Sequence, residues 1–209
     1  MSWHGLKPNM YLMISEVFKP AVTRIISPVA RFFLRIGLTP NAVTAIGAIS
    51  VVISALYFFP QGEFFVGTLV ISFFMLSDLF DGAMARISSQ GASKWGAFLD
   101  STVDRISDSA VLCGVAIYLI QEDDQLSIIY LVCLVTGMLI PYIRAKAESM
   151  NIACSGGIAE RTERAIIVLV GTGFHGLGVP YALSLSAWLL ATLGVVTTFQ
   201  RLIIVKRAI

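Results

Sequence analysis

Residues 39–60 read TPNAVTAIGAISVVISALYFFP, a run without a charged residue. Thr39 followed by Pro40 is typical of a helix start, because threonine caps the first turn and proline is tolerated at the first helical position. A membrane-spanning helix needs about 20 predominantly apolar residues. The run therefore predicts a transmembrane helix that begins near Pro40, and we expect Gly37 to end the segment before it.

The composition of the whole chain has the same bias. Of its 209 residues, 56% are hydrophobic and 13% are charged, against roughly 25% charged residues in an ordinary soluble domain. A soluble fold of this length cannot bury so much apolar surface, so we expect an all-α integral membrane protein. The composition excludes a disordered chain, a coiled coil and a disulfide scaffold. The net charge of +2 is too small to indicate a nucleic-acid partner.

Six segments of the chain are long and apolar enough to be spans. They are residues 39–60, 62–88, 96–121, 125–148, 160–178 and 181–204. Loops that carry Lys or Arg alternate along the chain with loops that carry neither, such as the purely acidic loop at 121–125. Basic loops stay on the cytoplasmic side, so the alternation predicts a multi-pass cell-membrane protein with both termini in the cytoplasm.

The segment before the first span predicts a different kind of helix. Ser27-Pro28 is typical of a helix start, and three arginines fall on one helical face: Arg24, Arg31 and Arg35. We expect an amphipathic helix that lies at the cytoplasmic membrane interface, with recognition of lipid headgroups as the alternative. We therefore expect two domains, an interfacial N-terminal segment at 1–38 and a six-helix transmembrane domain at 39–209.

Four aspartates lie inside the second and third predicted spans. Asp78 and Asp81 are near the end of one span, and Asp100 and Asp104 are near the start of the next. Each ionised aspartate at the middle of a membrane helix costs about 2.5–3.5 kcal/mol on insertion. Spacings of three and four residues put each pair on one face of its helix. Consecutive spans are antiparallel, so the four carboxylates can meet at the cytoplasmic side.

Four clustered carboxylates repel one another unless cations neutralise them. Oxygen ligands suit Mg²⁺, or alternatively Mn²⁺, and four charges match two such ions, which can clamp a displacement at phosphorus. The small residues Gly82 and Ala85 let a substrate come close, and Arg86 is suited to bidentate contact with phosphate. A structural charge network or an ion-transport path is the alternative interpretation of the cluster.

The complete pattern is DxxDGxxAR at 78–86 followed by GxxxDxxxD at 96–104. It resembles the signature of the CDP-alcohol phosphotransferase family, integral membrane enzymes of phospholipid synthesis. The resemblance implies an enzyme in which an alcohol displaces CMP from a CDP-linked lipid, and it implies a homodimer. It further implies that Asp78, Asp81 and Asp100 ligate one ion. Asp100 and Asp104 would contact the second, and Asp104 would also be the general base for the acceptor hydroxyl.

The resemblance also assigns a binding site for the CDP-lipid. Gly82 and Arg86 would hold the cytidine diphosphate, and the first turn of the first span offers N–H groups for phosphate or cytidine. The expected contacts are Asn41, Ala42, Val43, Thr44, Gly82, Ala85, Arg86 and Ser93. Asp108 continues the aspartate face beyond the signature. It is either a residue of the acceptor site or a buried partner of Arg105 or another cation.

Basic residues of the last three spans bear on the second substrate. Several cations within reach of an aspartate-rich site indicate an anionic acceptor, although each is alternatively a solvated or snorkelling charge. The candidates are Arg144, Lys146, Arg161, Arg164 and Arg201.

The acceptor itself is suggested by YIRAKAE at 142–148 followed by ERTER at 160–164. This pattern is similar to actinobacterial members of the family that transfer the phosphatidyl group of CDP-diacylglycerol to inositol 1-phosphate and form phosphatidylinositol phosphate. Glycerol 3-phosphate, the acceptor of members that make phosphatidylglycerol phosphate, is the alternative. The alternative outside enzymes is a cation or proton transporter.

Overall fold

The structure is a computed structural model that describes residues 27–76, 80, 82–84, 87, 93–154 and 156–209. Within these residues every regular element is helical. The elements are α2 (Pro40–Phe58), the 3₁₀ helix η1 (Phe59–Gln61), α3 (Phe64–Met75), α5 (Lys94–Gln121), α6 (Leu126–Ser149), α7 (Arg161–Gly176) and α8 (Ala182–Ala208). Residues 27–35 are helical as well, as are the described residues 80, 82–84 and 87.

These helices follow the order of the predicted spans. The start of α2 is confirmed: the Thr39 hydroxyl accepts a hydrogen bond of 3.2 Å from the Ala42 amide, and Pro40 is the first helical residue. Gly37 ends the preceding helix with a φ of +85°, a conformation that favours glycine. The third helix begins slightly earlier than predicted, at Lys94, because Ser93 caps it.

Three helical stretches are long and apolar enough to cross a membrane, namely Pro40–Gln61, Leu126–Ser149 and Ala182–Ala208. The apolar helix α3 is shorter in its described part, and most of the predicted span beyond Met75 lies outside the described residues. Over the residues that the structure describes, the prediction of an all-helical membrane protein is therefore confirmed. The count of six spans and the interfacial role of the N-terminal helix stay predictions, and residues 1–26 lie outside the description.

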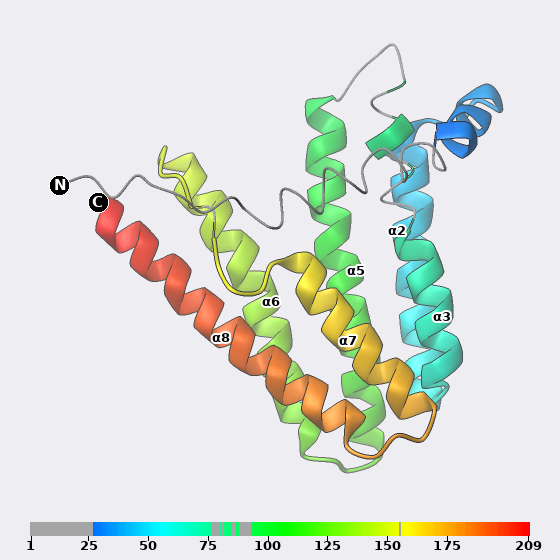
Figure 1. The fold of residues 1–209 in the computed structure, drawn as a ribbon, viewed down its shortest axis with the longest axis vertical. Coiled ribbons are helices and arrows are strands. Elements are labelled where there is room, and N and C mark those ends of the chain that lie inside the picture. Colours follow the sequence, from blue (N-terminus) through cyan, green and yellow to red (C-terminus); the bar gives the residue numbers. More distant parts are fainter. Residues whose placement is uncertain (1–26, 77–79, 81, 85–86, 88–92, 155) are drawn as a thin grey trace, which may run out of the picture.

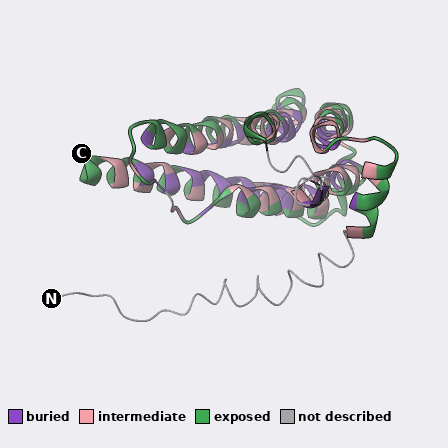
Figure 2. Ribbon diagram, turned by 90° about the horizontal axis from the view of Figure 1, so that it is seen from above, coloured by how far each residue is buried: buried purple, intermediate pink, exposed green. Residues whose placement is uncertain are grey.

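The helices form a bundle whose two ends differ (Figure 1). The loops after α2, α5 and α7 lie together at one end, and α6 and α8 slant away from α5 toward the other. In Figure 2 the exposed residues cover the outside of the bundle, and buried residues gather where helices meet. The main buried cluster includes Ile71, Val115, Leu119 and Tyr130. It belongs to the half nearer the acidic loop, so the other half is left for charged side chains.

Small residues let neighbouring helices approach closely. A Cβ atom on Gly114 of α5 would overlap the backbone carbonyl of Ala55 on α2, so these helices touch almost backbone to backbone. Polar contacts add to this packing: the hydroxyls of Thr68 on α3 and Thr172 on α7 are 2.8 Å apart and buried. Close approach at small residues and hydrogen bonds between helices are the usual ways in which membrane helices associate.

Candidate active site

Three aspartates of helix α5 lie on successive turns of the helix. The Ser93 hydroxyl accepts a hydrogen bond of 2.9 Å from the Gly96 amide and fixes the start of the helix. Asp100, Asp104 and Asp108 follow at intervals of four residues, so they lie along one face. The predicted alignment of Asp100 with Asp104 therefore follows directly from an unbroken helix through this region.

An ion-pair network joins this face of α5 to the start of α7. The Nη2 atom of Arg161 lies 2.9 Å from Oδ1 of Asp104, and its Nε lies 3.4 Å from Oδ1 of Asp108. Arg105 reaches both carboxylates from α5 itself, at 3.5 and 3.6 Å. The four side chains are between 15% and 28% exposed. The alternative in which Asp108 pairs with Arg105 or another cation is thus present in the structure.

Arg164, one turn along α7, is in a different environment. Its side chain is buried, and Nη1 has no hydrogen-bond partner among the described residues. It lines a cavity of about 40 Å³ together with Asp108, Arg161 and apolar residues of α3, α5, α6, α7 and α8. A buried cationic group with an unmade hydrogen bond is unfavourable by itself. An anion bound at this position would supply the missing acceptor.

The position of α7 strengthens this preference for an anion. The helix begins at Arg161, so Arg161 and Arg164 both lie in its first turn. That turn is the positive end of the helix dipole, where added cations are unfavourable and anions are stabilised. Two arginines at this end therefore suit the binding of a strongly negative group.

The other predicted acceptor cations occupy three different settings. Arg201 of α8 is 3% exposed and donates to the carbonyls of Gly156, at 3.0 Å, and Ile140, at 2.7 Å. It lies within electrostatic range of both Arg164 and Arg144. Arg144 itself is half-exposed and pairs with Glu148 at 2.8 Å. Lys146 faces a separate groove between α6 and α8 and does not line the cavity beside Arg164.

Some of the predicted nucleotide contacts lie together at the starts of α2 and α5. A Cβ atom on Gly96 would lie 2.9 Å from the Asn41 side-chain oxygen and 3.1 Å from the Ser93 hydroxyl, so these three residues are neighbours. The Thr44 hydroxyl donates to the carbonyl of Pro40 at 3.1 Å. Val43 packs in a small cluster with three further buried residues, Ala30, Ala83 and Met84. This cluster brings the described part of the signature helix beside α2, with Gly82 next to Ala83 in sequence.

Four residues of the signature lie outside the described residues: Asp78, Asp81, Ala85 and Arg86. The meeting of all four carboxylates therefore stays a prediction. Within the described part of the chain, no three His, Cys, Asp or Glu side chains are grouped closely enough to hold a metal. Asp100 and Asp104 do supply two carboxylates on successive turns, and this donor type fits Mg²⁺ or Mn²⁺.

Arg105 was not among the predicted site residues, yet it contacts both Asp104 and Asp108. The signal was present in the sequence. An arginine three residues before Asp108 on a helix is at pairing distance. The partner contributed by Arg161 carried no such local signal, because it comes from a distant helix.

The sequence matches the family described as CDP-alcohol phosphatidyltransferase over residues 37–203. Two similar curated proteins carry the name phosphatidylinositol phosphate synthase. The one from Mycobacterium tuberculosis is 47% identical over 189 residues, 88% of this chain and 87% of its own length. The one from Streptomyces avermitilis is 39% identical over 204 residues, 93% of this chain and 83% of its own length.

Two solved structures of the M. tuberculosis phosphatidylinositol phosphate synthase share this fold. The crystal structure with CDP-DAG bound superposes with a TM-score of 0.83 at 47% identity, covering 87% of this chain and 94% of that one. The crystal structure in complex with manganese and citrate gives a TM-score of 0.82 at 46% identity, covering 86% and 88%.

Proposed function

The chain belongs to the CDP-alcohol phosphatidyltransferase family, and from this premise we propose that it is a metal-dependent phosphatidylinositol phosphate synthase of membrane phospholipid synthesis. It transfers the phosphatidyl group of CDP-diacylglycerol to inositol 1-phosphate and releases CMP. Relatives of that name align with nearly the whole chain, and the similar enzyme from M. tuberculosis has been crystallised with CDP-DAG.

One observation carries the choice of a phosphorylated acceptor. Arg161 contacts Asp104, and Arg164 lies one turn further along the same helix with an unpaired buried nitrogen. A phosphate held by these arginines would place the rest of the acceptor next to the Asp104 carboxylate. Arg201, within electrostatic range of Arg164, adds positive charge to the same region, and Arg144 lies within electrostatic range of Arg201. A free polyol gains nothing from this set of cations.

The proposed reaction is a direct displacement at phosphorus. Asp104 accepts the proton of an inositol hydroxyl, and the resulting oxygen forms a bond to the phosphatidyl phosphorus. The bond between that phosphorus and the oxygen of CMP breaks, and CMP leaves with the bonding electrons. Arg161 orients the Asp104 carboxylate in the absence of substrate through its 2.9 Å contact. An acceptor phosphate that engages Arg161 would free Asp104 for proton transfer.

Divalent cations complete the proposed site. Asp78, Asp81, Asp100 and Asp104 would hold two Mg²⁺ ions, with Mn²⁺ as a substitute, and such ions offset charge on the diphosphate and on the leaving group. The manganese complex of the M. tuberculosis relative supports a dependence on divalent metal. Asp100 and Asp104 present the oxygen donors that these ions prefer.

The nucleotide end of the lipid substrate belongs at the starts of α2 and α5 in this proposal. Asn41, Ser93 and Gly96 are neighbours there, beside the helix that carries the signature. The first turns of two helices offer backbone N–H groups to phosphate oxygens. Ala42, Val43, Thr44, Gly82, Ala85 and Arg86 complete the proposed CDP-lipid site.

We further propose that the chain crosses the cell membrane six times with both termini and the active site in the cytoplasm, and that it forms a homodimer. The alternation of basic and non-basic loops supports this topology. In the structure the acidic loop after α5 lies at one end of the bundle, and the starts of α2 and α5 lie toward the other (Figure 1).

Release of CMP by the purified protein tests the proposal. The assay contains CDP-diacylglycerol, a divalent metal, and inositol 1-phosphate, glycerol 3-phosphate or free inositol. We expect the fastest release with inositol 1-phosphate. Preference for glycerol 3-phosphate would reassign the acceptor, and equal rates with free inositol would refute a phosphate site. An absence of CMP release with every acceptor, together with proton or cation flux in vesicles, would support a transporter.

The five cation variants locate the acceptor phosphate within the same assay. Changing a true ligand to alanine should raise the KM for the alcohol phosphate at least about tenfold, which corresponds to about 1.4 kcal/mol. We expect this effect at Arg161, Arg164 and Arg201, a smaller one at Arg144 and none at Lys146. The Asp104→Asn variant should lose turnover while it still binds CDP-diacylglycerol. Normal turnover in this variant would rule out the general-base role.

A further inference from the structure

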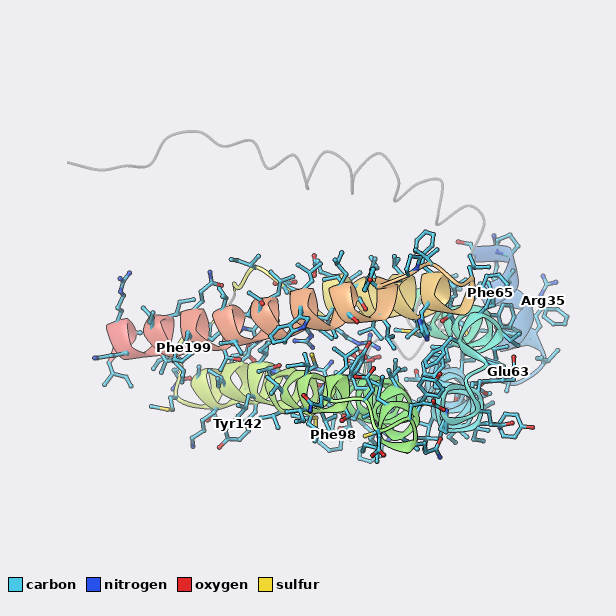
Figure 3. All side chains as sticks on the ribbon, turned by 90° about the horizontal axis from the view of Figure 1, so that it is seen from below. Arg35, Glu63, Phe65, Phe98, Tyr142 and Phe199 are labelled. Carbon is cyan, nitrogen blue, oxygen red and sulfur yellow. The ribbon has the colours of Figure 1, made fainter. Side chains whose placement is uncertain are left out.

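We propose that a groove between the C-terminal parts of α6 and α8 holds one anionic phospholipid of the surrounding membrane. The groove has a volume of about 450 Å³, and its walls are formed by Tyr142 and Ala147 of α6 and by Leu202 and Val205 of α8. Figure 3 labels Tyr142 on α6 and shows α8, with Phe199, running beside it. The groove is separate from the cavity that Arg161 and Arg164 line.

The shape of the groove fits an acyl chain. Ala147 is almost completely buried at the groove, whereas Tyr142 is 63% and Leu202 is 48% exposed. A small residue between larger, exposed apolar ones leaves a depression that opens to the outside of the helix pair. Both helices are long and apolar enough to cross a membrane, so in the proposed topology the groove lies at the cytoplasmic end of two spans, within reach of the lipid.

The charge at the groove selects the headgroup. Two lysines, Lys146 and Lys206, are part of the lining, and the lining contains no aspartate or glutamate. Basic pockets between transmembrane helices near the membrane surface bind anionic lipid headgroups. A zwitterionic lipid could place its chain in the same groove but would gain little from two ammonium groups.

These lysines also lie near helix C-termini, where cations interact favourably with the helix dipole. That effect does not distinguish Lys206 from Arg207, which follows it at the end of α8 and does not line the groove. Arg207 is therefore the matched control. A role in helix stability alone would make the two positions equivalent, whereas lipid binding makes only Lys206 and Lys146 matter.

Tryptophan quenching by brominated lipids in vesicles tests the proposal without an activity assay. In Tyr142→Trp, a reporter at the groove would be quenched by dibromo-phosphatidylglycerol in a phosphatidylcholine background. In Ile203→Trp, the reporter follows the groove residue Leu202 on α8 but is at an exposed position outside the groove lining. The signal of the protein without a new tryptophan is subtracted, because the chain has three of its own.

We expect phosphatidylglycerol to be enriched around the groove reporter at least about fivefold over its fraction in the vesicle. The reason is that one lysine near a membrane surface contributes about 1 kcal/mol, which is equivalent to about fivefold. Lys146→Ala with Lys206→Ala should remove the preference, Lys146→Arg with Lys206→Arg should retain it, and Arg207→Ala should leave it unchanged. The reporter at 203 should follow bulk composition. Equal quenching of both reporters, or an unchanged preference in the double alanine variant, would overturn the proposal.

Discussion

The guanidinium of Arg161 and the carboxylate of Asp104 are 2.9 Å apart, although the two residues are 57 positions apart in the chain. In the described structure this arginine neutralises an aspartate that the family resemblance assigns to metal binding and to proton transfer. In the proposed mechanism, metal, acceptor phosphate and Arg161 therefore all act on this one carboxylate. Arg105 also contacts Asp104, at 3.5 Å, so the charge balance there involves two arginines.

The first prediction concerns stability without metal. Changing Arg161 to glutamine removes one ion-pair partner from both Asp104 and Asp108, which lie close on one helix and keep their contacts with Arg105. We expect a loss of about 1 kcal/mol in EDTA, because the pair is partly exposed, and a smaller loss with Mg²⁺ present. Thermal unfolding in the two conditions measures the difference. Equal losses with and without metal would contradict the shared role of Asp104.

The second prediction concerns the metal ligands. Asp78→Asn, Asp81→Asn and Asp100→Asn should each abolish CMP release, because each removes a ligand charge from a bound cation. The protein should stay folded, and loss of like charge should not lower its stability in EDTA. CMP release and thermal unfolding of the same preparations check both parts. Normal turnover in any one variant would refute the assignment of two metal ions to these aspartates.

The third prediction concerns Arg164. Replacing this buried arginine by methionine should raise the KM for inositol 1-phosphate at least about tenfold and leave CDP-diacylglycerol binding nearly intact. The free energy of unfolding should fall little, since the change removes a buried nitrogen that lacks a hydrogen-bond partner, and Asp108 keeps its ion pairs with Arg105 and Arg161. Glu148→Gln, which removes the partner of half-exposed Arg144, provides a control with little expected effect. A destabilised Arg164→Met variant with an unchanged KM would show a purely structural role.

The fourth prediction concerns topology. In a background without Cys113, Cys133 and Cys154, a cysteine placed at Asp123 should react with an impermeant thiol reagent on intact cells. A cysteine placed at Lys94 should react only after the membrane is opened. Equal labelling of both positions from outside would overturn the six-span topology with cytoplasmic termini.

The fifth prediction concerns the contact between α2 and α5. Gly114→Ala should destabilise the protein by about 1–3 kcal/mol, because the added methyl meets the rigid backbone carbonyl of Ala55. The matched control is Gly137→Ala on α6, where the nearest atom would be 4.0 Å away, so little loss of stability is expected. Thermal unfolding of the two variants, compared with the parent, gives the answer. Similar losses for both would mean that general helix effects dominate.

Much of the fold follows from local sequence. The cap at Thr39 and the stop at Gly37 depend on residues within a few positions of each other and were predicted, whereas the cap at Ser93, although equally local, was not, and the predicted span begins at residue 96. The slant of α6 and α8 away from α5 (Figure 1) depends on contacts among helices far apart in sequence, and no local pattern encodes it.

The candidate site divides in the same way. The alignment of Asp100 and Asp104 is a property of one helix and was predictable from spacing. The hydrogen bonds from Arg201 to the carbonyls of Ile140 and Gly156 were not, because backbone carbonyls have no sequence signature. A list of basic residues therefore suggests an anionic ligand, but only the folded chain separates Arg164, with its unpaired nitrogen, from Lys146 in another groove.

The contact of Gly114 with Ala55 also has a consequence for motion. Helices α2 and α5 touch there and again where Asn41 meets Gly96, so they are joined at two levels and cannot slide past one another without a clash. Together they form a fixed wall that carries Asp100 and Asp104. Any change in the width of the candidate site therefore falls to the other helices, among them α6 and α8, which slant away from α5 (Figure 1).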